Sequence, residues 1–155
     1  MATKFASYFM DKPVDTGFER FKIGPGPNDF ADSPAIIQPT SSTNKYLKKT
    51  IVLTDINCYS ASTTFLYSVD PIETVQTMGQ QSSGGSGAFA DGFLSNGWQW
   101  TLSVSEFIDA KGRHLDNGVA PDLPVALDTT NMEVDEVNSK MDNSINFRIF
   151  SKCTS

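Results

Sequence analysis

Residues 50–62 read T-I-V-L-T-D-I-N-C-Y-S-A-S, and this stretch decides how the rest of the chain is interpreted. The continuous apolar run within Thr50–Thr54 predicts a short strand that is buried on both faces. Asp55–Tyr59 predicts a turn, and Ser60–Val69 predicts a helix with one apolar face. The sequence therefore places a serine where a buried strand gives way to a helix.

The segments that follow extend this pattern. Pro71 ends the predicted helix, and Val75–Met78 predicts the next strand. Strand, helix and strand at this spacing predict a right-handed parallel crossover, which places the chain in the α/β class. A closing strand is expected at Leu123–Leu127, where Pro124 restricts it to an edge. Glu133–Ile149 predicts a helix with an apolar face surrounded by acidic residues.

Less regular structure is expected before residue 50. Lys4–Phe9 predicts the last turns of a helix, and Phe18–Ile23 predicts an irregular strand. Residues 24–45 are rich in Gly, Pro, Ser, Thr and Asn. Such a composition predicts a long irregular segment, which in a small domain is usually functional.

Residues 98–107 alternate as W-Q-W-T-L-S-V-S-E-F. The alternation predicts a half-buried strand with Trp98, Trp100, Leu102 and Val104 on the core face. The two tryptophans could instead form a stacking platform, which would suit a carbohydrate-binding module. Core packing is the commoner role of two tryptophans on one strand face.

Composition excludes several classes of function. The chain has 155 residues, 39% hydrophobic and 19% charged, as in a single globular domain. Its formal charge is -6 and no cluster of Lys or Arg stands out, so nucleic acid is not an expected partner. No apolar run is long enough to cross a bilayer, and no secretory signal is visible.

Metal and cofactor sites have little support in the sequence. His114 is the only histidine, and Cys58 and Cys153 are the only cysteines. Their spacing matches no zinc site, so no metal or organic cofactor is expected. One disulfide and two buried thiols both remain open. Gly84–Gly87 lacks the Lys-Ser/Thr pair of a phosphate-binding loop, so a flexible loop beside an active site is the preferred interpretation.

Ser60 is the candidate nucleophile. A turn between strand and helix lifts its hydroxyl clear of the sheet, and the helix N-terminus favours an oxyanion nearby. The amide of Ala61 is free to point at that oxyanion. Serine is also a preferred helix N-cap, so a purely structural role stays open, as does a division of work between Ser60 and Ser62.

Four blocks of sequence resemble the C-terminal processing peptidase and tricorn-core family of serine peptidases. Residues 50–62 are similar to its nucleophile strand and S-A pair. Residues 78–87 (M-G-Q-Q-S-S-G-G-S-G) resemble its G-x-x-T-x-G-G-x-G loop, and residues 96–98 resemble its N-G-W hairpin. Residues 115–125 (L-D-N-G-V-A-P-D-L-P-V) resemble its closing motif I-E-x-G-V-x-P-D-I-x-V. The blocks stand in the family's order.

The resemblance implies an α/β fold of the ClpP/crotonase type, a spiral of ββα units, of which this chain holds part of the catalytic domain. Within a single domain, residues 1–49 would be a loop-rich N-terminal segment, residues 50–128 the nucleophile-bearing core, and residues 129–155 a C-terminal helix and tail. The family's D-x-R-x-N-x-G-G stretch and its histidine are expected in a preceding segment. That missing N-terminal part of the same catalytic domain is therefore an expected partner.

The resemblance also implies peptide-bond hydrolysis of a polypeptide through an acyl-enzyme on Ser60. One branch of the family uses a Ser-Lys dyad, but the lysine position reads Gly85 here. The tricorn-like branch places a glutamate where this chain has Asp116, which is therefore the candidate acidic partner. Asp116 could orient a base, accept a substrate amine, or serve only as a turn residue. His114 is expected to be a solvated turn residue rather than the base.

An inactive peptidase-like domain that binds peptides or a partner is the alternative function. The missing base and the aspartate at the glutamate position favour it. An exported location, periplasmic or extracellular, is expected because many relatives are exported. The oligomeric state is not predicted.

Overall fold

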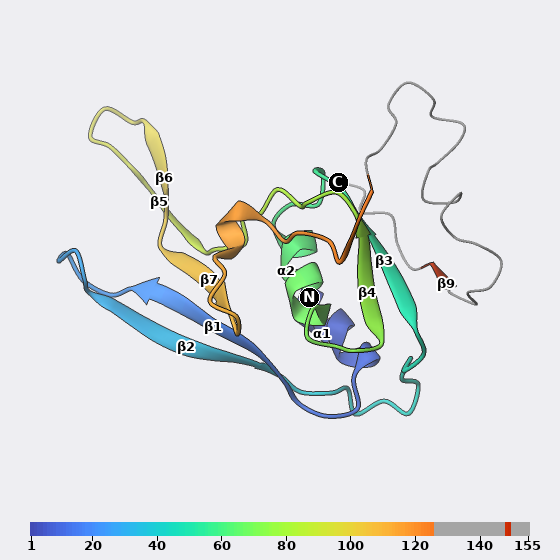
Figure 1. Ribbon diagram of the computed structural model, residues 1–155. Helices are drawn as coiled ribbons and strands as arrows, with labels where there is room; N and C mark the ends of the chain where they lie inside the picture. The colour runs from blue at the N-terminus through green and yellow to red at the C-terminus, as the bar shows by residue number, and fades with distance from the viewer. Residues whose placement is uncertain (126–147, 150–155) are drawn as a thin grey trace, which may run out of the picture.

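One helix lies between two sheets, and a third sheet of two strands projects from them (Figure 1). The computed structural model describes residues 1–125 and the short strand at 148–149. In chain order the elements are α1 (Ala2–Ala6), η1 (Ser7–Phe9), β1 (Val14–Lys22), β2 (Phe30–Ile37), β3 (Thr50–Thr54), α2 (Ala61–Val69), β4 (Val75–Gly79), β5 (Phe89–Phe93), β6 (Gln99–Ser103), β7 (Ser105–Asp109), η2 (Leu115–Asn117), β8 (Leu123–Pro124) and β9 (Arg148–Ile149). The α/β class is confirmed, whereas the spiral of ββα units stays a prediction.

A four-stranded sheet of order β8-β4-β3-β9 contains the central crossover. β3 and β4 are parallel, with Thr50 opposite Val75 and Thr54 opposite Gly79, and α2 connects them. The predicted strand, helix and parallel strand are thus confirmed. β8 pairs only with β4 in the described sheet, so it lies at the edge to which Pro124 restricts it.

The helix predicted over Glu133–Ile149 is tested at its end alone, because residues 133–147 lie outside the described residues. Arg148–Ile149 form β9, which runs parallel to the start of β3. The prediction was wrong for these two residues. The open edge of β3 offers unpaired backbone groups to another segment of the chain. Pairing of residues 148–149 with that edge overrides their local helical periodicity.

The core forms where α2 packs between the sheets. Leu66 and Val69 are both 0% exposed, which confirms the predicted apolar face of the helix. The ring of Phe65 lies 5.3 Å from that of Phe5, and this contact joins α2 to α1. The helical structure predicted near the N-terminus is confirmed by α1 and η1. The buried cluster consists of Ala6, Phe9, Met10, Ile37, Val52, Cys58, Leu66, Tyr67, Val69, Ile72, Val75, Leu115 and Val119. Cys153 lies outside the described residues.

The N-terminal region is more regular than the sequence suggested. β1 confirms the strand predicted at Phe18–Ile23, and it lies between β2 and β7 in an antiparallel sheet. β2 falls within residues 24–45, where an irregular segment was expected. Pro34 is tolerated there because β2 is an edge strand, on which one side of the backbone needs no partner.

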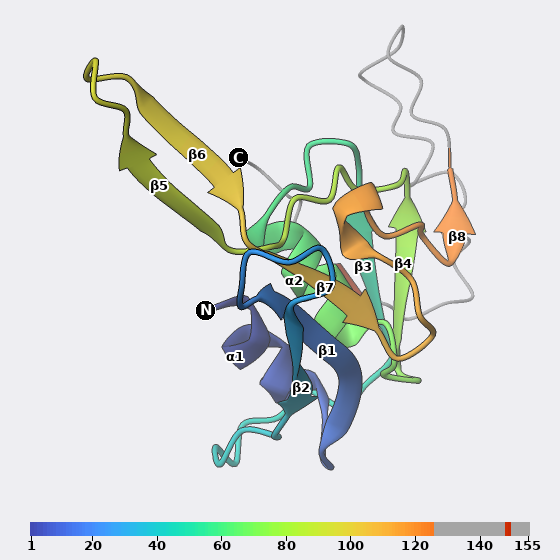
Figure 2. The same cartoon turned by 90° about the vertical axis from the view of Figure 1, so that its left-hand side faces the viewer.

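The half-buried strand expected over residues 98–107 was wrong. The chain forms two strands there, β6 and β7, and β6 pairs with β5 in a ribbon that stands away from the body of the molecule (Figure 2). Trp98 is 72% exposed and Leu102 is 63% exposed, so this face does not line the core. Alternation predicts that a strand has two different faces, but it does not say what covers either one.

No helix in the part of the chain that the structure describes has the length and apolar character needed to span a membrane.

The contrast between the core and the ribbon predicts different effects of one chemical change. Leu66→Ala should lower the free energy of unfolding by about 2–5 kcal/mol, because it leaves a cavity in a packed interior. Leu102→Ala removes the same atoms from a solvent-exposed site and should cost less than about 0.5 kcal/mol. Urea unfolding in dilute protein solution measures both, and equal losses would contradict the exposed ribbon.

Candidate active site

The turn before α2 is anchored in the core at one end and exposed at the other. The N–H of Cys58 donates to the carbonyl of Asp55 over 3.0 Å, and the N–H of Ser83 donates to the carbonyl of Cys58 over 2.9 Å. The Cys58 side chain is buried in the core cluster. Because Cys58 points inward, the next two residues, Tyr59 and Ser60, reach the surface.

Ser60 has an unusual backbone conformation. With φ 54° and ψ −113°, it is the only residue other than glycine with a positive φ in the described residues. Such a conformation costs about 1–3 kcal/mol and persists only where the surroundings enforce it. Ser60 occupies the N-cap position of α2, yet its hydroxyl makes no capping hydrogen bond. A capping hydrogen bond therefore does not account for a serine at this position.

Three backbone segments that are distant in sequence meet at this serine. The N–H of Ser60 donates to the carbonyl of Gly84 over 2.9 Å, and Tyr59 forms an isolated parallel bridge with Gly84. Gly84 has φ +80°, and a Cβ atom there would lie 2.2 Å from the carbonyl oxygen of Asp116. The turn before α2, the glycine-rich loop and the closing motif thus lie side by side.

Ser82 joins the glycine-rich loop to the closing motif. Its side chain is 3% exposed, and its hydroxyl oxygen accepts the N–H of Val119 over 2.9 Å. The N–H of Ser82 in turn donates to the carbonyl of Val119 over 3.1 Å. The Ser82 hydroxyl thus satisfies a buried backbone donor of the closing motif.

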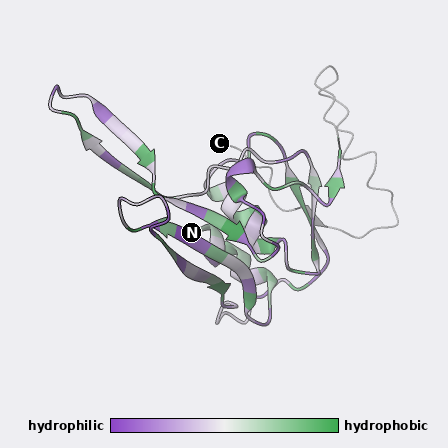
Figure 3. Ribbon diagram, turned by 60° about the vertical axis from the view of Figure 1, so that its left-hand side comes forward, coloured by the Kyte–Doolittle hydropathy of each residue, from purple (hydrophilic) through white to green (hydrophobic). Residues whose placement is uncertain are grey.

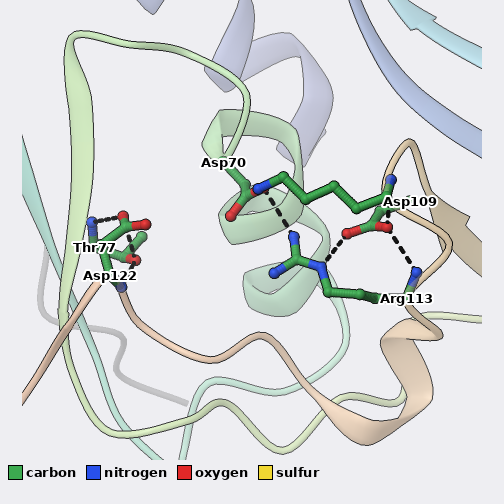
Figure 4. A network of polar contacts seen from close by, with 6 residues as sticks. Asp70, Thr77, Asp109, Arg113 and Asp122 are labelled. Carbon is green, nitrogen blue, oxygen red and sulfur yellow. Dashed lines mark hydrogen bonds and ion pairs between the residues drawn. The ribbon is translucent and has the colours of Figure 1, made fainter.

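Asp122 holds the end of the closing motif on β4 (Figure 4). Its carboxylate accepts the N–H of Thr77 over 2.7 Å and the hydroxyl of Thr77 over 2.9 Å. The N–H of Asp122 donates back to the same hydroxyl over 2.9 Å. These three bonds give the aspartate of the P-D pair a structural role.

A second polar network lies at the opposite end of α2 (Figure 4). Arg113 and Lys111 each approach Asp70 at 2.9 Å, and Arg113 also bonds to Asp109. Burial lowers the pKa of Arg113, but its hydrogen bond to Asp109 and the charge of Asp70 outweigh burial and raise the pKa overall. Lys111 is therefore paired with Asp70, which lies about 15 Å from Ser60 along the helix axis.

Tyr59 is a residue of the site that sequence reasoning missed. A Cβ atom at Gly85 would lie 2.1 Å from the Tyr59 ring, so the aromatic side chain fills the space beside the loop. Gly85 also has φ +70°, which a lysine rarely adopts. The Tyr59 ring and this backbone together disfavour a dyad lysine at position 85. The sequence carried no local signal of this contact, because Tyr59 and Gly85 are distant along the chain.

The structure places the other predicted residues with mixed results. Ala61 is the first residue of α2, where an amide has no acceptor within the helix. Asp116 is exposed in η2, with its backbone against Gly84. His114 Nδ1 lies 2.9 Å from Glu106 Oε2, and the His114 side chain is 51% exposed, which confirms a solvated histidine. Residues 96–98 lie at the tip of the ribbon, outside this cluster.

An open pocket begins one helical turn after Ser60. The Thr64 hydroxyl donates to the Ser60 carbonyl over 3.3 Å, and Thr64 lines a cavity of about 410 Å³. Lys4, Ile36 and Tyr67 are among the other lining residues. Burial raises the pKa of Tyr67, so its phenol is neutral at physiological pH. The volume lies within the range of small-molecule and side-chain pockets.

Substitution of Gly84 tests the stacked backbone. Gly84→Ala should destabilise the protein by clearly more than Gly112→Ala. The control has nearly the same φ, +79° against +80°, but nothing within 4 Å of its Cβ position. Gly112→Ala should cost about 1–2 kcal/mol from backbone strain alone. Urea unfolding of the two variants measures the difference, and equal losses would show that the Asp116 backbone does not press on Gly84.

Comparison with known proteins identifies relatives of this arrangement. A model of peptidase family S41 matches residues 3–125. The chain is similar to a solved "putative peptidase" from Parabacteroides merdae, with 32% identity and a TM-score of 0.77, over 84% of this chain and 41% of that chain. No curated protein sequence matches.

Two more distant structures share the fold. Mature CPAF has 12% identity and a TM-score of 0.69, with 84% of this chain and 37% of that chain covered. The photosystem II D1 C-terminal processing protease has 16% identity and a TM-score of 0.59, with 80% and 30% covered. The chain thus spans less than half the length of each structure. Because the family model matches most of its residues, the chain belongs to peptidase family S41.

Proposed function

We propose that this chain carries the nucleophile of a serine peptidase and that Ser60 is that nucleophile. The observation that carries the proposal is the exposed serine with a positive φ at the start of α2. A strained conformation without a capping bond has no structural benefit of its own, and such strain is concentrated at functional sites. Membership of a peptidase family supports the same chemistry.

The proposed reaction begins with attack of the Ser60 oxygen on the carbonyl carbon of a peptide bond, while a base takes the hydroxyl proton. The amide of Ala61, at the positive end of α2, would stabilise the negative charge that develops on the carbonyl oxygen. The amine leaves with a proton, and water then hydrolyses the acyl-enzyme. The pocket beside Thr64 would accept a substrate side chain.

The base is proposed to come from a segment of the catalytic domain that lies outside this chain. In the described residues, no hydrogen bond joins the Ser60 side chain to a histidine, lysine or carboxylate. Asp116 is the proposed acidic partner, because its backbone adjoins Gly84, which binds the Ser60 amide. Its carboxylate would orient the base or hold a substrate amine.

Labelling with a fluorophosphonate probe tests the nucleophile. The probe should form an adduct on Ser60 in the longest natural polypeptide that contains this chain, and mass spectrometry of the peptides locates it. Ser60→Ala should abolish labelling, whereas Ser62→Ala should retain it. The isolated chain should react about 100-fold more slowly or worse, because the base is absent. An adduct that survives Ser60→Ala would refute the assignment.

The same probe tests Asp116. Asp116→Asn keeps the size of the side chain but removes its charge, and it should slow labelling of the longer polypeptide by about 10-fold to 100-fold. Asp91→Asn, an exposed aspartate in the ribbon, is the matched control and should leave the rate unchanged. A rate unaffected by Asp116→Asn would reduce Asp116 to a turn residue.

The inactive, peptide-binding domain is the second candidate function. The observation that favours it is the lack of a bonded base at Ser60 in residues 1–125. The two functions differ in one outcome. Peptide binding without any adduct in either polypeptide would support the inactive domain.

A further inference from the structure

One face of the β5–β6 ribbon is apolar and carries no charge. Cross-strand pairing puts Ala90 opposite Leu102 and Gly92 opposite Trp100, and the Leu94 N–H donates to the Trp98 carbonyl. Paired residues share a face of the ribbon. We call this face the tryptophan face; its members are Ala90, Gly92, Leu94, Trp98, Trp100 and Leu102.

The opposite face of the ribbon differs in character. It pairs Asp91 with Thr101, Phe89 with Ser103 and Phe93 with Gln99. It therefore alternates aromatic rings with polar groups and contains the one charged residue of β5 and β6. A partner that needs a dry, uncharged surface would select the tryptophan face.

Nothing in the described part of the chain covers the tryptophan face. The ribbon stands clear of both larger sheets (Figure 3), and its four large apolar side chains, Leu94, Trp98, Trp100 and Leu102, are all exposed. With about 200 Å² for a whole tryptophan side chain and roughly 150 Å² for leucine, the exposed fractions amount to roughly 400 Å². A two-stranded ribbon is marginally stable alone, so covering this face would stabilise it.

We infer that the tryptophan face is covered by the same face of a second copy of this chain. The chain has a formal charge of -6, so two copies carry the same net charge and repel each other. The tryptophan face adds nothing to this repulsion, because it carries no charged residue. Because the ribbon projects, two copies can meet at this face while the rest of each molecule stays apart (Figures 1 and 2).

Two copies can stack their tryptophan faces against each other through a twofold contact. Face-to-face stacking buries no charged side chain, since Asp91 of each copy points outward. Twofold contacts between identical patches are the commonest form of self-association. The pair would bury about 800 Å² in total, below a standard interface, which predicts a weak, reversible dimer. This inference does not depend on the proposed peptidase activity.

Intrinsic fluorescence tests the inference without any substitution. Both tryptophans of the chain lie on the tryptophan face, so the emission reports this surface alone. On raising the concentration through the micromolar range, the emission should shift to shorter wavelength while the sedimentation coefficient rises towards that of a dimer. Trp98→Ser combined with Leu102→Ser should give a monomer throughout. Phe89→Ser combined with Phe93→Ser removes two apolar side chains from the opposite face and should still dimerise.

Three outcomes would overturn the inference. A wild-type chain that stays monomeric with solvent-exposed emission leaves the face uncovered. A monomer with short-wavelength emission at every concentration means that the chain covers its own ribbon. Dimerisation retained by Trp98→Ser with Leu102→Ser, or lost in the control pair, places the contact elsewhere. Circular dichroism of each variant confirms folding independently of the ribbon tryptophans.

Discussion

The conformation of this site depends on one hydrogen bond, from the Ser60 amide to the Gly84 carbonyl. A serine with a positive φ is unfavourable by itself, so its neighbours must hold it in place. Burial of Cys58 on one side and the start of α2 on the other determine the path of the chain. Gly84 can lie close enough to accept this bond because it has no side chain. Any Cβ atom at position 84 would collide with the Asp116 backbone. The strained backbone of Ser60 therefore depends on a glycine at position 84.

Several motif residues around the site hold the backbone in place. The Ser82 hydroxyl satisfies the Val119 amide, and the Asp122 carboxylate binds Thr77 on β4. The first bond ties the closing motif to the loop that supports Ser60, and the second ties it to the strand that precedes this loop. The motif residues would therefore keep the serine in its strained conformation whether or not a base is present. This is why the resemblance of the motifs establishes the family more firmly than it establishes activity.

The two ends of α2 have opposite electrostatic character. Ser60 lies at the N-terminal end, where free amides favour negative charge. Asp70 lies at the C-terminal end, where a carboxylate is unfavourable, and Lys111 and Arg113 offset its charge. Lys111 and Arg113 thus lie at the end of α2 away from Ser60. The positive end of the helix dipole therefore lies beside Ser60.

The sequence by itself determined the strand, turn and helix around Ser60, because burial on both faces and helical periodicity are local properties of residues 50–69. It also indicated that the glycine-rich loop and the closing motif belong to the same site. Only the tertiary structure decided which surfaces are covered. Pro34 fits a strand because β2 lies at an edge, and Trp98 faces solvent because the ribbon leaves the body of the molecule. Burial depends on contacts between distant segments, and alternation along one strand contains no record of them.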